Sequence, residues 1–554
     1  MSLLRINNLH TVLHSSGGDV HAVKGINLQI DPGETLCLVG ESGSGKSVTA
    51  LSIMRLLPSG IVDHPHGEIL LQALDGESPD HHSIDLLQLN ADRMSSIRGR
   101  RMSMIFQEPM SSLNPVFTVG EQITEALQLA WPGMPEREAR AIALQTLDEV
   151  QIKDPEVRFN EYPHRLSGGQ RQRVMIAMAL VCQPDLLIAD EPTTALDVTV
   201  QKEILNLIAE LQQKKGMAVL FITHDLGVVA QIADRVAVMK NGEIVEQGVH
   251  EQVLYQPVHP YTVSLLDALP ENLQRQNRVE QKPEVMLETR NLKIWFPVRR
   301  GLLRRIADHV RAVDDVSVSI HRGEIVALVG ESGSGKSTLG RAMVRLLEPT
   351  DGTIYYRGDE IGSLSAQEFR PYRTDLQVVF QDPLSSLNPR LTIATTLTEP
   401  MAVHGIGDSH EHRIQLAEQL LEDVQLPKEY LWRYPHEFSG GQRQRIGIAR
   451  ALAVKPQLIV CDEVTSALDV SVQAELLQLL LRLRQQYGLT LLFITHNISV
   501  VEYISDRTLV MHQGKLIETG TTSQVCGNPQ QEYTKTLIDA VPRLQKNQEP
   551  APTF

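Results

Sequence analysis

The chain has 554 residues, of which 42% are hydrophobic and only 4% aromatic, and this length predicts at least two domains, each large enough for its own core. Its 52 Lys and Arg residues against 67 Asp and Glu residues give a net charge of −15, which makes it a poor candidate for sequence-independent DNA binding. The four cysteines include no CxxC pair, which argues against a disulfide framework and a thiolate zinc site. The sequence shows no signal-peptide pattern, and it has no run of ~18 apolar residues that would predict a membrane-spanning helix. We therefore expect a cytosolic protein, or one that reaches a membrane only through a partner.

The first half begins with alternating apolar residues at Val23–Ile30, which predict a half-buried strand. The apolar run Leu36–Val39 predicts a buried strand, and a glycine-rich loop and a helical stretch, Lys46–Leu57, follow it. Further along, Leu186–Ala189 and Val219–Thr223 are short apolar runs between polar turns, which again predict buried strands. Strands that alternate with helices are typical of an α/β fold with a mainly parallel sheet.

The second half repeats the first. LVGESGSGKS at Leu38–Ser47 recurs within Leu328–Thr338, and SGGQRQR and LFITH also occur twice. The two glycine-rich loops are 290 positions apart, whereas Gln107 and Gln381 are 274 apart, so the first copy carries about 16 extra residues. We place them around Leu74–Arg98 and interpret them as a surface-loop insertion. A repeat of this length indicates two domains related by duplication. In the second copy the alternating strand, the buried strand and the helix are expected at Val313–Ile320, Val326–Val329 and Lys336–Leu347.

The repeat also sets the expected domain boundaries. The segment PENLQRQNRVEQKP is polar, bracketed by prolines and without apolar periodicity, which is typical of a linker. We expect a first domain at residues 1–269, a linker at 270–286, a second domain at 287–542 and a flexible tail at 543–554.

Each copy carries the pattern GxxxxGK[ST] directly after a buried strand and before a helix. Its glycines let backbone N–H groups point inward as an anion nest, its lysine supplies charge for the β- and γ-phosphates, and its last hydroxyl suits Mg²⁺. One isolated copy of this pattern can occur by chance, but two copies, each between a buried strand and a helix, predict two nucleotide-binding loops. The expected phosphate-binding residues are Gly40, Glu41, Ser42, Gly43, Ser44, Gly45, Lys46 and Ser47 in the first copy, and Gly330, Glu331, Ser332, Gly333, Ser334, Gly335, Lys336, Ser337 and Thr338 in the second.

Two adjacent acidic residues follow an apolar run in each copy (LLIADE and LIVCDE). The aspartate is placed to hold Mg²⁺ beside the phosphate loop, and the glutamate to polarise the attacking water. An aspartate that only begins a turn is the alternative, which the adjacent glutamate weakens. A histidine ends the LFITH strand 34 positions after each aspartate, and this shared spacing favours contact with the γ-phosphate over a structural role. The expected metal-holding acids are Asp190 and Asp462, and the expected catalytic residues are Glu191, His224, Glu463 and His496.

The string SGGQ opens a predicted helix in each copy, running to Leu180 and to Leu452. A serine cap, paired glycines and a helix N-terminus form a second anion-binding device. An ordinary Ser-Gly helix cap is the alternative. A second phosphate-binding site in one domain is expected, however, if it binds the nucleotide held by a partner domain, and the other copy supplies that partner. These residues are Ser167, Gly168, Gly169 and Gln170, and Ser439, Gly440, Gly441 and Gln442.

Taken together, these motifs resemble those of tandem ATP-binding cassette (ABC) ATPases, which carry both nucleotide-binding domains on one chain. The resemblance covers nearly everything except the linker and the tail. It implies two P-loop domains, each with a RecA-like core, an antiparallel β subdomain and a helical subdomain that carries SGGQ. It also implies head-to-tail docking, with each nucleotide between the phosphate loop of one domain and SGGQ of the other. The implied Mg²⁺ ligands are Ser47, Gln107, Asp190, Ser337, Gln381 and Asp462.

Some residues depart from the family pattern. Phe438 replaces the usual leucine before SGGQ, and Val464 replaces the proline present at the same point in the first copy; neither change removes a catalytic group. The second copy offers Trp295 and Phe296 as the aromatic residue that stacks on adenine. We hypothesise weaker nucleotide binding at the first site, because the first copy offers only Leu13, His14 or His21 there.

The loops FQEPMSSLNP and FQDPLSSLNP, and the endings HPYTVSLLDALP and QEYTKTLIDAVP, are similar to the peptide and nickel importer branch of the family. The single-chain layout most resembles the ATPase subunit of microcin-C-type peptide importers, with that of glutathione importers close behind. The resemblance implies ATP and Mg²⁺ as cofactors, peptide uptake as the function, and nickel or glutathione as alternatives. Many relatives carry an iron–sulfur cluster after the histidine, but we expect none, because only Cys526 follows there.

The implied partners are two membrane permeases, which the segments after Gln107 and Gln381 would contact, and through them a periplasmic or extracellular solute-binding protein. The implied location is the cytoplasmic face of the bacterial inner membrane. A soluble tandem ABC protein of translation or DNA repair is the rival class. It predicts basic inserts, a long charged arm or zinc cysteines, and the sequence carries none of them, so we expect no nucleic-acid partner.

Overall fold

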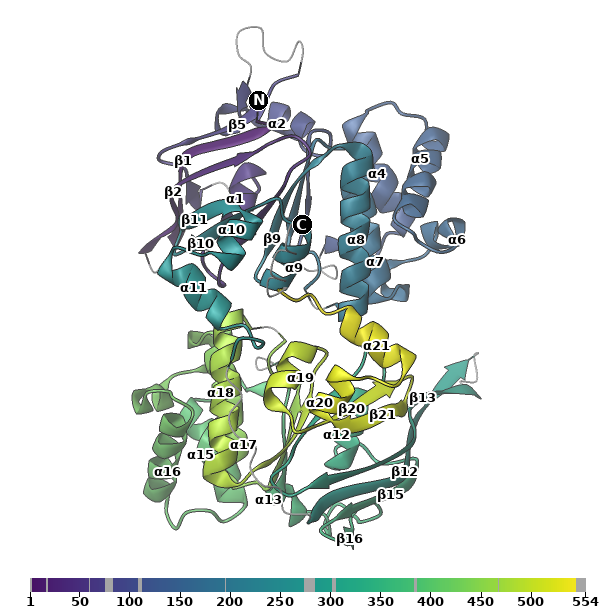
Figure 1. Ribbon diagram of the computed structural model, residues 1–554, viewed down its shortest axis with the longest axis vertical. Helices are drawn as coiled ribbons and strands as arrows, with labels where there is room; N and C mark the ends of the chain where they lie inside the picture. Colours follow the sequence, from purple (N-terminus) through teal and green to yellow (C-terminus); the bar gives the residue numbers. More distant parts are fainter. Residues whose placement is uncertain are drawn as a thin grey trace, which may run out of the picture. The chain divides into compact units, whose positions relative to one another are not determined.

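The computed structural model describes residues 2–15, 18–58, 60–74, 83–107, 112–194, 196–273, 284–300, 305–382, 386–466 and 468–544. The chain forms two compact units, each with sheets and helices (Figure 1). The first comprises residues 1–196, 200–266 and 542–554, and the second comprises residues 197–199 and 267–541. Most of the predicted linker (274–283) and most of the predicted tail (545–554) lie outside the described residues.

The core of the first unit is a six-stranded sheet in the order β11-β10-β3-β9-β8-β7, parallel except for β11. Every residue of its three central strands β3, β9 and β8 is buried, as expected for a parallel sheet covered on both faces. The predicted buried strands are therefore confirmed. The strands are β3 (Thr35–Val39), β7 (Met102–Ile105), β8 (Leu186–Asp190), β9 (Ala218–Thr223), β10 (Arg235–Lys240) and β11 (Glu243–Val249).

A second, antiparallel sheet in this unit has the order β2-β1-β5-β6, with β4 paired to β1. Along β2 the buried side chains are Val23, Ile26, Leu28 and Ile30, which confirms the predicted alternation. They pack with residues of the parallel sheet and of α1 in one hydrophobic cluster. The elements are β1 (Leu4–Ser15), β2 (Gly18–Ile30), β4 (Val62–Asp63), β5 (Glu68–Gln72), β6 (Ser83–Asp85) and α1 (Lys46–Ile53).

A group of helices, α4 to α7, makes a third part of the first unit and lies beyond α8, away from β1 and β2 (Figure 1). Capping boxes open α4 at Thr118 and α7 at Ser167, so side chains satisfy N–H groups of each first turn. The helices are α2 (Ala91–Ile97), α4 (Val119–Ala130), α5 (Glu136–Glu149), α6 (Pro155–Phe159), α7 (Gly168–Leu180), α8 (Val198–Lys215), α9 (Leu226–Ile232), α10 (His250–Tyr255) and α11 (Pro260–Asp267), with 3₁₀ turns η1 (Leu86–Gln88) and η2 (Pro163–Arg165).

The second unit repeats this architecture. Its main sheet has the order β17-β18-β19-β14-β20-β21, in which only β21 is antiparallel to its neighbour, and its antiparallel sheet has the order β13-β12-β15-β16. The strands are β12 (Val285–Arg300), β13 (Arg305–His321), β14 (Ile325–Val329), β15 (Asp351–Tyr356), β16 (Asp359–Glu360), β17 (Leu376–Val379), β18 (Leu458–Asp462), β19 (Thr490–Ile494), β20 (Arg507–His512) and β21 (Lys515–Thr521). The helices are α12 (Lys336–Met343), α13 (Tyr372–Asp375), α15 (Ile393–Val403), α16 (His410–Asp423), α17 (Gly440–Leu452), α18 (Val470–Tyr487), α19 (Ile498–Ile504), α20 (Thr522–Gly527) and α21 (Glu532–Asp539), with 3₁₀ turns η3 (Lys428–Trp432) and η4 (Pro435–Glu437).

The helices after the two glycine-rich loops are shorter than predicted. They end at Ile53 and Met343 because an arginine adopts the left-handed backbone conformation soon afterwards, with φ of 49° at Arg55 and 58° at Arg345. Each guanidinium then donates hydrogen bonds to backbone carbonyls of a later segment, such as Leu86 O at 3.2 Å from Arg55. These tertiary bonds stabilise the break, which helix propensity alone does not predict.

The interpretation of Leu74–Arg98 as one surface-loop insertion is wrong for its second part. Leu86 and Met94 are buried, and they correspond to the buried Ile361 and Phe369 of the second unit at a constant offset of 275. This part is therefore shared by both copies rather than inserted. Residues 75–82 of the proposed insertion lie outside the described residues.

Candidate active site

The two phosphate loops are tightly enclosed by backbone. Gly40 and Gly45 have φ of 151° and 107°, and Gly330 and Gly335 have nearly the same values. A Cβ atom at any of these four positions would lie between 1.9 and 2.5 Å from a backbone carbonyl oxygen of a neighbouring segment. Only glycine fits there, so the loop geometry that orients the N–H groups depends on these positions.

The lysine of each loop folds across it. Lys46 Nζ donates to the carbonyl oxygens of Gly40 at 2.7 Å and Glu41 at 2.8 Å, and Lys336 Nζ makes the same two bonds at 2.8 Å in the second copy. Both lysines are buried, and burial lowers the pKa of Lys336. Each ammonium group therefore lies against the backbone of the loop that is expected to hold phosphate.

A hydroxyl and a carboxylate meet beside each loop. Ser47 Oγ donates to Asp190 Oδ1 at 3.1 Å, and Ser337 Oγ donates to Asp462 Oδ1 at 2.7 Å. Both aspartates are buried, and burial raises the pKa of Asp190. Hydroxyl and carboxylate oxygens are the ligands that Mg²⁺ prefers, so these predicted metal ligands fit that ion.

The second copy adds a cation to this pair, which the sequence analysis missed. Arg341 Nη2 lies 3.1 Å from Asp462 Oδ2, on the same carboxylate that receives the Ser337 hydroxyl. The corresponding position of the first copy, at the offset of 290 shared by the two loops, is Leu51. The signal was present in the sequence: five residues after the lysine, the first copy has a leucine and the second an arginine. The two aspartates therefore differ in their electrostatic surroundings.

The two catalytic candidates Glu191 and Glu463 follow β8 and β18 in a left-handed conformation, with φ of 47° and 49°. Such strained positions cluster at active sites, and here the same strain occurs in both copies. Gln107 Nε2 donates to Glu191 Oε2, and Gln381 Nε2 donates to Glu463 Oε2, each at 2.8 Å. The structure thus brings the predicted glutamine and glutamate of each copy into direct contact.

The histidines complete these clusters. His224 Nδ1 lies 3.1 Å from Glu191 Oε1, and the corresponding distance from His496 to Glu463 is 3.7 Å. Burial would raise the pKa of Glu191, but the bond to His224, the Thr194 hydroxyl at 2.9 Å and nearby charge lower it to about 2. The pKa of Glu463 is also lowered, chiefly through His496 against the effect of burial. Both carboxylates are therefore ionised at neutral pH.

The SGGQ residues lie at the exposed starts of α7 and α17. Ser167 and Ser439 cap these helices by accepting the N–H of the glutamine three residues on, at 3.3 and 3.4 Å. A Cβ atom on Gly169 would lie 2.8 Å from a side-chain atom of Val200 on α8, whereas a Cβ atom on Gly440 would meet nothing within 4 Å. The first glycine thus leaves the helix N-terminus open, and the second allows close packing beneath it.

Comparison with known proteins agrees with this geometry. The ABC transporter family pattern matches residues 23–194 and 313–466, which contain both phosphate loops and both acidic pairs. The chain belongs to the ABC transporter family. A second pattern, the oligopeptide/dipeptide transporter C-terminal region, matches this ABC protein at residues 245–293 and 517–553. As a tandem ABC ATPase of an importer, the protein hydrolyses ATP, and ATPases of this family generally bind ATP with Mg²⁺.

Two relatives are named glutathione import ATP-binding protein GsiA. The ABC ATPase is 48% identical to the one from Salmonella paratyphi A (strain ATCC 9150 / SARB42), over 98% of this chain and 89% of the relative. It is also 48% identical to the one from Escherichia coli (strain K12), over 98% and 90%. A solved ATP-binding cassette, dimeric and bound to ADP and phosphate, is 30% identical over 43% of this chain and 99% of its own, with a TM-score of 0.39.

The strand positions of the ABC ATPase bear on the adenine-stacking candidates. Leu13 pairs with Val20, and Phe296 pairs with Val310, and these partners are 290 residues apart, like the two lysines. Leu13 therefore occupies in the first unit the place that Phe296 has in the second. The ring of Trp295 is already engaged, because a guanidinium lies 4.8 Å from it and its Nε1 donates to a carboxylate at 3.2 Å. Phe296 is 43% exposed.

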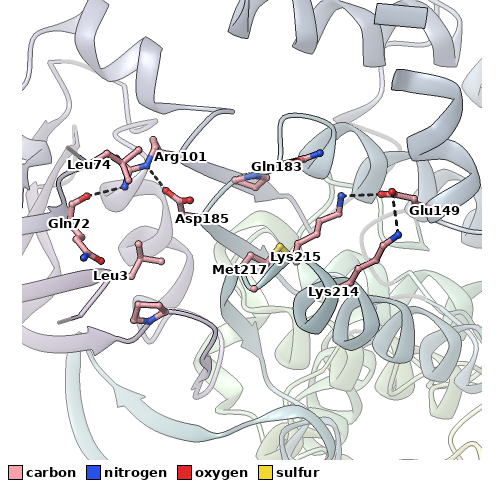
Figure 2. Close-up of a pocket in the computed structure, with 13 residues that line it drawn as sticks. Leu3, Gln72, Leu74, Arg101, Glu149, Gln183, Asp185, Lys214, Lys215 and Met217 are labelled. Carbon is pink, nitrogen blue, oxygen red and sulfur yellow. Dashed lines mark hydrogen bonds and ion pairs between the residues drawn. The ribbon is translucent and has the colours of Figure 1, made fainter. Parts of the chain in front are cut away.

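A pocket of about 570 Å³ in the first unit is separate from these sites (Figure 2). Its charged side chains bind one another: Arg101 pairs with Asp185, and Lys214 and Lys215 both approach Glu149, at 3.4 and 3.0 Å. Residues of the phosphate loop do not line it. The pocket is therefore distinct from the nucleotide site.

The described part of the ABC ATPase contains neither a candidate membrane-spanning helix nor a cluster of side chains that could hold a metal ion by itself. Among these residues, no helix combines the length and the apolar character needed to cross a membrane. Over the same ranges, no group of three or more His, Cys, Asp and Glu side chains is placed to hold a metal ion by itself.

Proposed function

We propose that this ABC ATPase drives the import of short peptides through separate membrane permeases. The observation that carries the proposal is the oligopeptide/dipeptide transporter region, which follows the ATPase motifs in both copies. The relatives at 48% identity are named for import of glutathione, which is itself a tripeptide. Glutathione is therefore the first substrate to test, and other oligopeptides, such as microcin-type peptide antibiotics, come next.

Each site would bind and hydrolyse ATP with residues of its own unit as follows. The loops Gly40–Ser47 and Gly330–Thr338 hold the triphosphate through N–H groups and the lysine. Mg²⁺, when bound, neutralises charge on the β- and γ-phosphates, and the chain offers it a serine hydroxyl, an aspartate and the nearby glutamine. The ionised Glu191 or Glu463 accepts a proton from the attacking water. The histidine beside each glutamate holds that carboxylate in place and contacts the γ-phosphate.

Each site would be completed by the other copy. We propose that Ser439–Gln442 close the nucleotide held by the first loop and that Ser167–Gln170 close the one held by the second. The open helix N-termini at these residues support this, because an exposed N-terminus attracts phosphate oxygens. On this view the domains are residues 1–269 and 287–542, joined by the linker 270–286 and followed by the tail 543–554. Separately expressed halves would then hydrolyse ATP only when mixed.

The protein would act at the cytoplasmic face of the inner membrane. It would bind two permease subunits, which receive solute from a periplasmic or extracellular binding protein. It would bind no nucleic acid and contain no iron–sulfur cluster. Closing of the two halves on ATP and reopening after hydrolysis would be linked to the conformation of the permeases.

The test is reconstitution of the full chain with its permeases in vesicles, followed by ATPase measurements with candidate solutes. We expect glutathione or an oligopeptide, presented with its binding protein, to stimulate hydrolysis several-fold, and the matched variants Glu191→Gln and Glu463→Gln to lose the stimulated rate. A response to Ni²⁺ alone would indicate that the protein imports nickel, as other members of the same importer branch do, and not peptides. Association with ribosomes in place of membranes would contradict import altogether.

A further inference from the structure

The C-terminal region of each unit contacts the phosphate loop of the same unit through one tyrosine. The Tyr261 hydroxyl on α11 accepts the backbone N–H of Glu41 at 3.2 Å, and the Tyr533 hydroxyl on α21 accepts that of Glu331 at 3.0 Å. These tyrosines are 272 residues apart in the related endings HPYT and QEYT. The same bond therefore forms independently in both copies, within the region matched by the peptide-transporter pattern.

Each tyrosine binds a peptide group that the lysine of the same phosphate loop also binds. In the first copy, the Glu41 N–H and the Gly40 carbonyl belong to one trans peptide, and Lys46 Nζ donates to that carbonyl at 2.7 Å. Lys336 and Tyr533 enclose the corresponding peptide of the second loop in the same way. The first peptide of each phosphate loop is thus held from its carbonyl side by the lysine and from its N–H side by the tyrosine.

A carboxylate anchors the segment that presents each tyrosine. Glu246 on β11 accepts the backbone N–H groups of Val258 at 2.8 Å and His259 at 3.1 Å, just before α11. Glu518 on β21 makes the same pair of bonds, at 2.8 and 3.1 Å, just before α21. Burial raises the pKa of both glutamates, but the Thr262 hydroxyl and the backbone bonds of Glu246, and the backbone bonds and the Thr534 hydroxyl of Glu518, lower it by more, so that each pKa lies below its ordinary value. The helix that carries the tyrosine is therefore fixed to the edge strand of the main sheet.

The tyrosine rings are also held in place. Lys240 Nζ lies 4.4 Å from the centre of the Tyr261 ring, and the His512 ring lies 4.0 Å from that of Tyr533. Lys240 and His512 occupy corresponding positions at the ends of β10 and β20. Because phenylalanine keeps the ring and loses only the hydroxyl that bonds to the loop, removal of the hydroxyl isolates the effect of that bond.

We propose that Tyr261 and Tyr533 are positioning residues of the two ATP sites. When the lysine leaves the loop carbonyl to bind phosphate, the tyrosine hydroxyl still accepts the N–H of the first loop peptide and so keeps that peptide in its orientation. The C-terminal region thereby stabilises the ATP-bound form of the loop. This inference rests on the proposed role of Gly40–Ser47 and Gly330–Ser337 as ATP-binding loops.

The test compares Tyr261→Phe and Tyr533→Phe in the full-length chain with matched Tyr-to-Phe controls. The controls are Tyr255→Phe on α10 and Tyr503→Phe on α19, whose hydroxyls make no bond to a phosphate loop among the described contacts. We expect the test variants to raise the KM for ATP about three- to tenfold, the effect of one net hydrogen bond, with kcat at saturating ATP changed less than about twofold. The unfolding midpoint without nucleotide should stay within about 2 °C of the parent.

The outcomes separate the inference from the function on which it rests. An unchanged KM in both test variants would overturn the positioning role, and so would an equal rise in KM in the controls. A lower unfolding midpoint with unchanged KM would show that the tyrosines serve stability alone and would also overturn it. Absence of ATP binding by the parent chain would instead contradict the ATP-binding role of the loops.

Discussion

Exchange of one side chain between the copies should exchange their affinities for ATP. Leu13 occupies the strand position that Phe296 has in the second unit, and Phe296 is 43% exposed, so its ring is available to stack on a base. Base–aromatic stacking contributes about 1–3 kcal/mol when measured against alanine, and leucine keeps part of the apolar contact. We therefore expect Leu13→Phe to tighten ATP binding at the first site about five- to tenfold, and Phe296→Leu to weaken the second by a similar factor.

Each affinity is measured in a chain whose other loop has lost its lysine, through Lys336→Ala or Lys46→Ala. A fluorescent ATP analogue titrated without turnover reports the dissociation constant of the remaining site. Leu129→Phe, at an exposed position of α4, is the control for adding an aromatic ring elsewhere. Equal affinities of the two sites in the parent chain, or no response to either exchange, would refute the reasoning from strand position.

Three further outcomes follow from the site geometry. Glu191→Gln or Glu463→Gln should lower the turnover of its own site by about 10²–10⁴-fold with ATP binding retained, in single-turnover assays; an unchanged rate would remove that residue as the base. Because the pKa of Glu191 is lowered to about 2, its ionisation stabilises the folded state above its ordinary pKa, and this stabilisation is lost as the pH falls toward 2. Glu191→Gln should therefore make the free energy of unfolding depend less on pH on the acid side, as measured by chemical denaturation. An unaltered pH dependence in the variant would argue against the lowered pKa. Arg341→Leu should reduce the Mg²⁺ concentration needed by the second site, since it frees Asp462 of a competing cation, and identical Mg²⁺ titrations of parent and variant would exclude that competition.

Much of the fold was predictable because local patterns and tertiary environment agree. The alternation at Val23–Ile30 and the apolar runs at Leu36–Val39 and Leu186–Ala189 correspond to observed strands, since each faces a core of the expected kind. The ends of α1 and α12 were not predictable, because left-handed arginines bonded to distant carbonyls decide them. The second part of the supposed insertion was missed for a similar reason: only the fold shows that Leu86 is buried.

Within the candidate site, only the fold shows that Gln107 and His224 bond to Glu191; the residue types themselves were accessible through motif spacing and the family resemblance. The contact of Tyr261 with the phosphate loop was not, although both endings share the tyrosine, because 220 residues separate it from Glu41 and only the fold brings them together.

The most direct test of peptide import is uptake of labelled glutathione, or of a labelled oligopeptide, by vesicles that contain the permeases and this ATPase. ATP is supplied on the side of the membrane that carries the ATPase. We expect the labelled solute to accumulate only when ATP is present, and this accumulation to be lost in the double variant Glu191→Gln/Glu463→Gln although that variant still binds ATP. Uptake that persists in the double variant, or ATP hydrolysis that never responds to any peptide, would contradict the proposed peptide import.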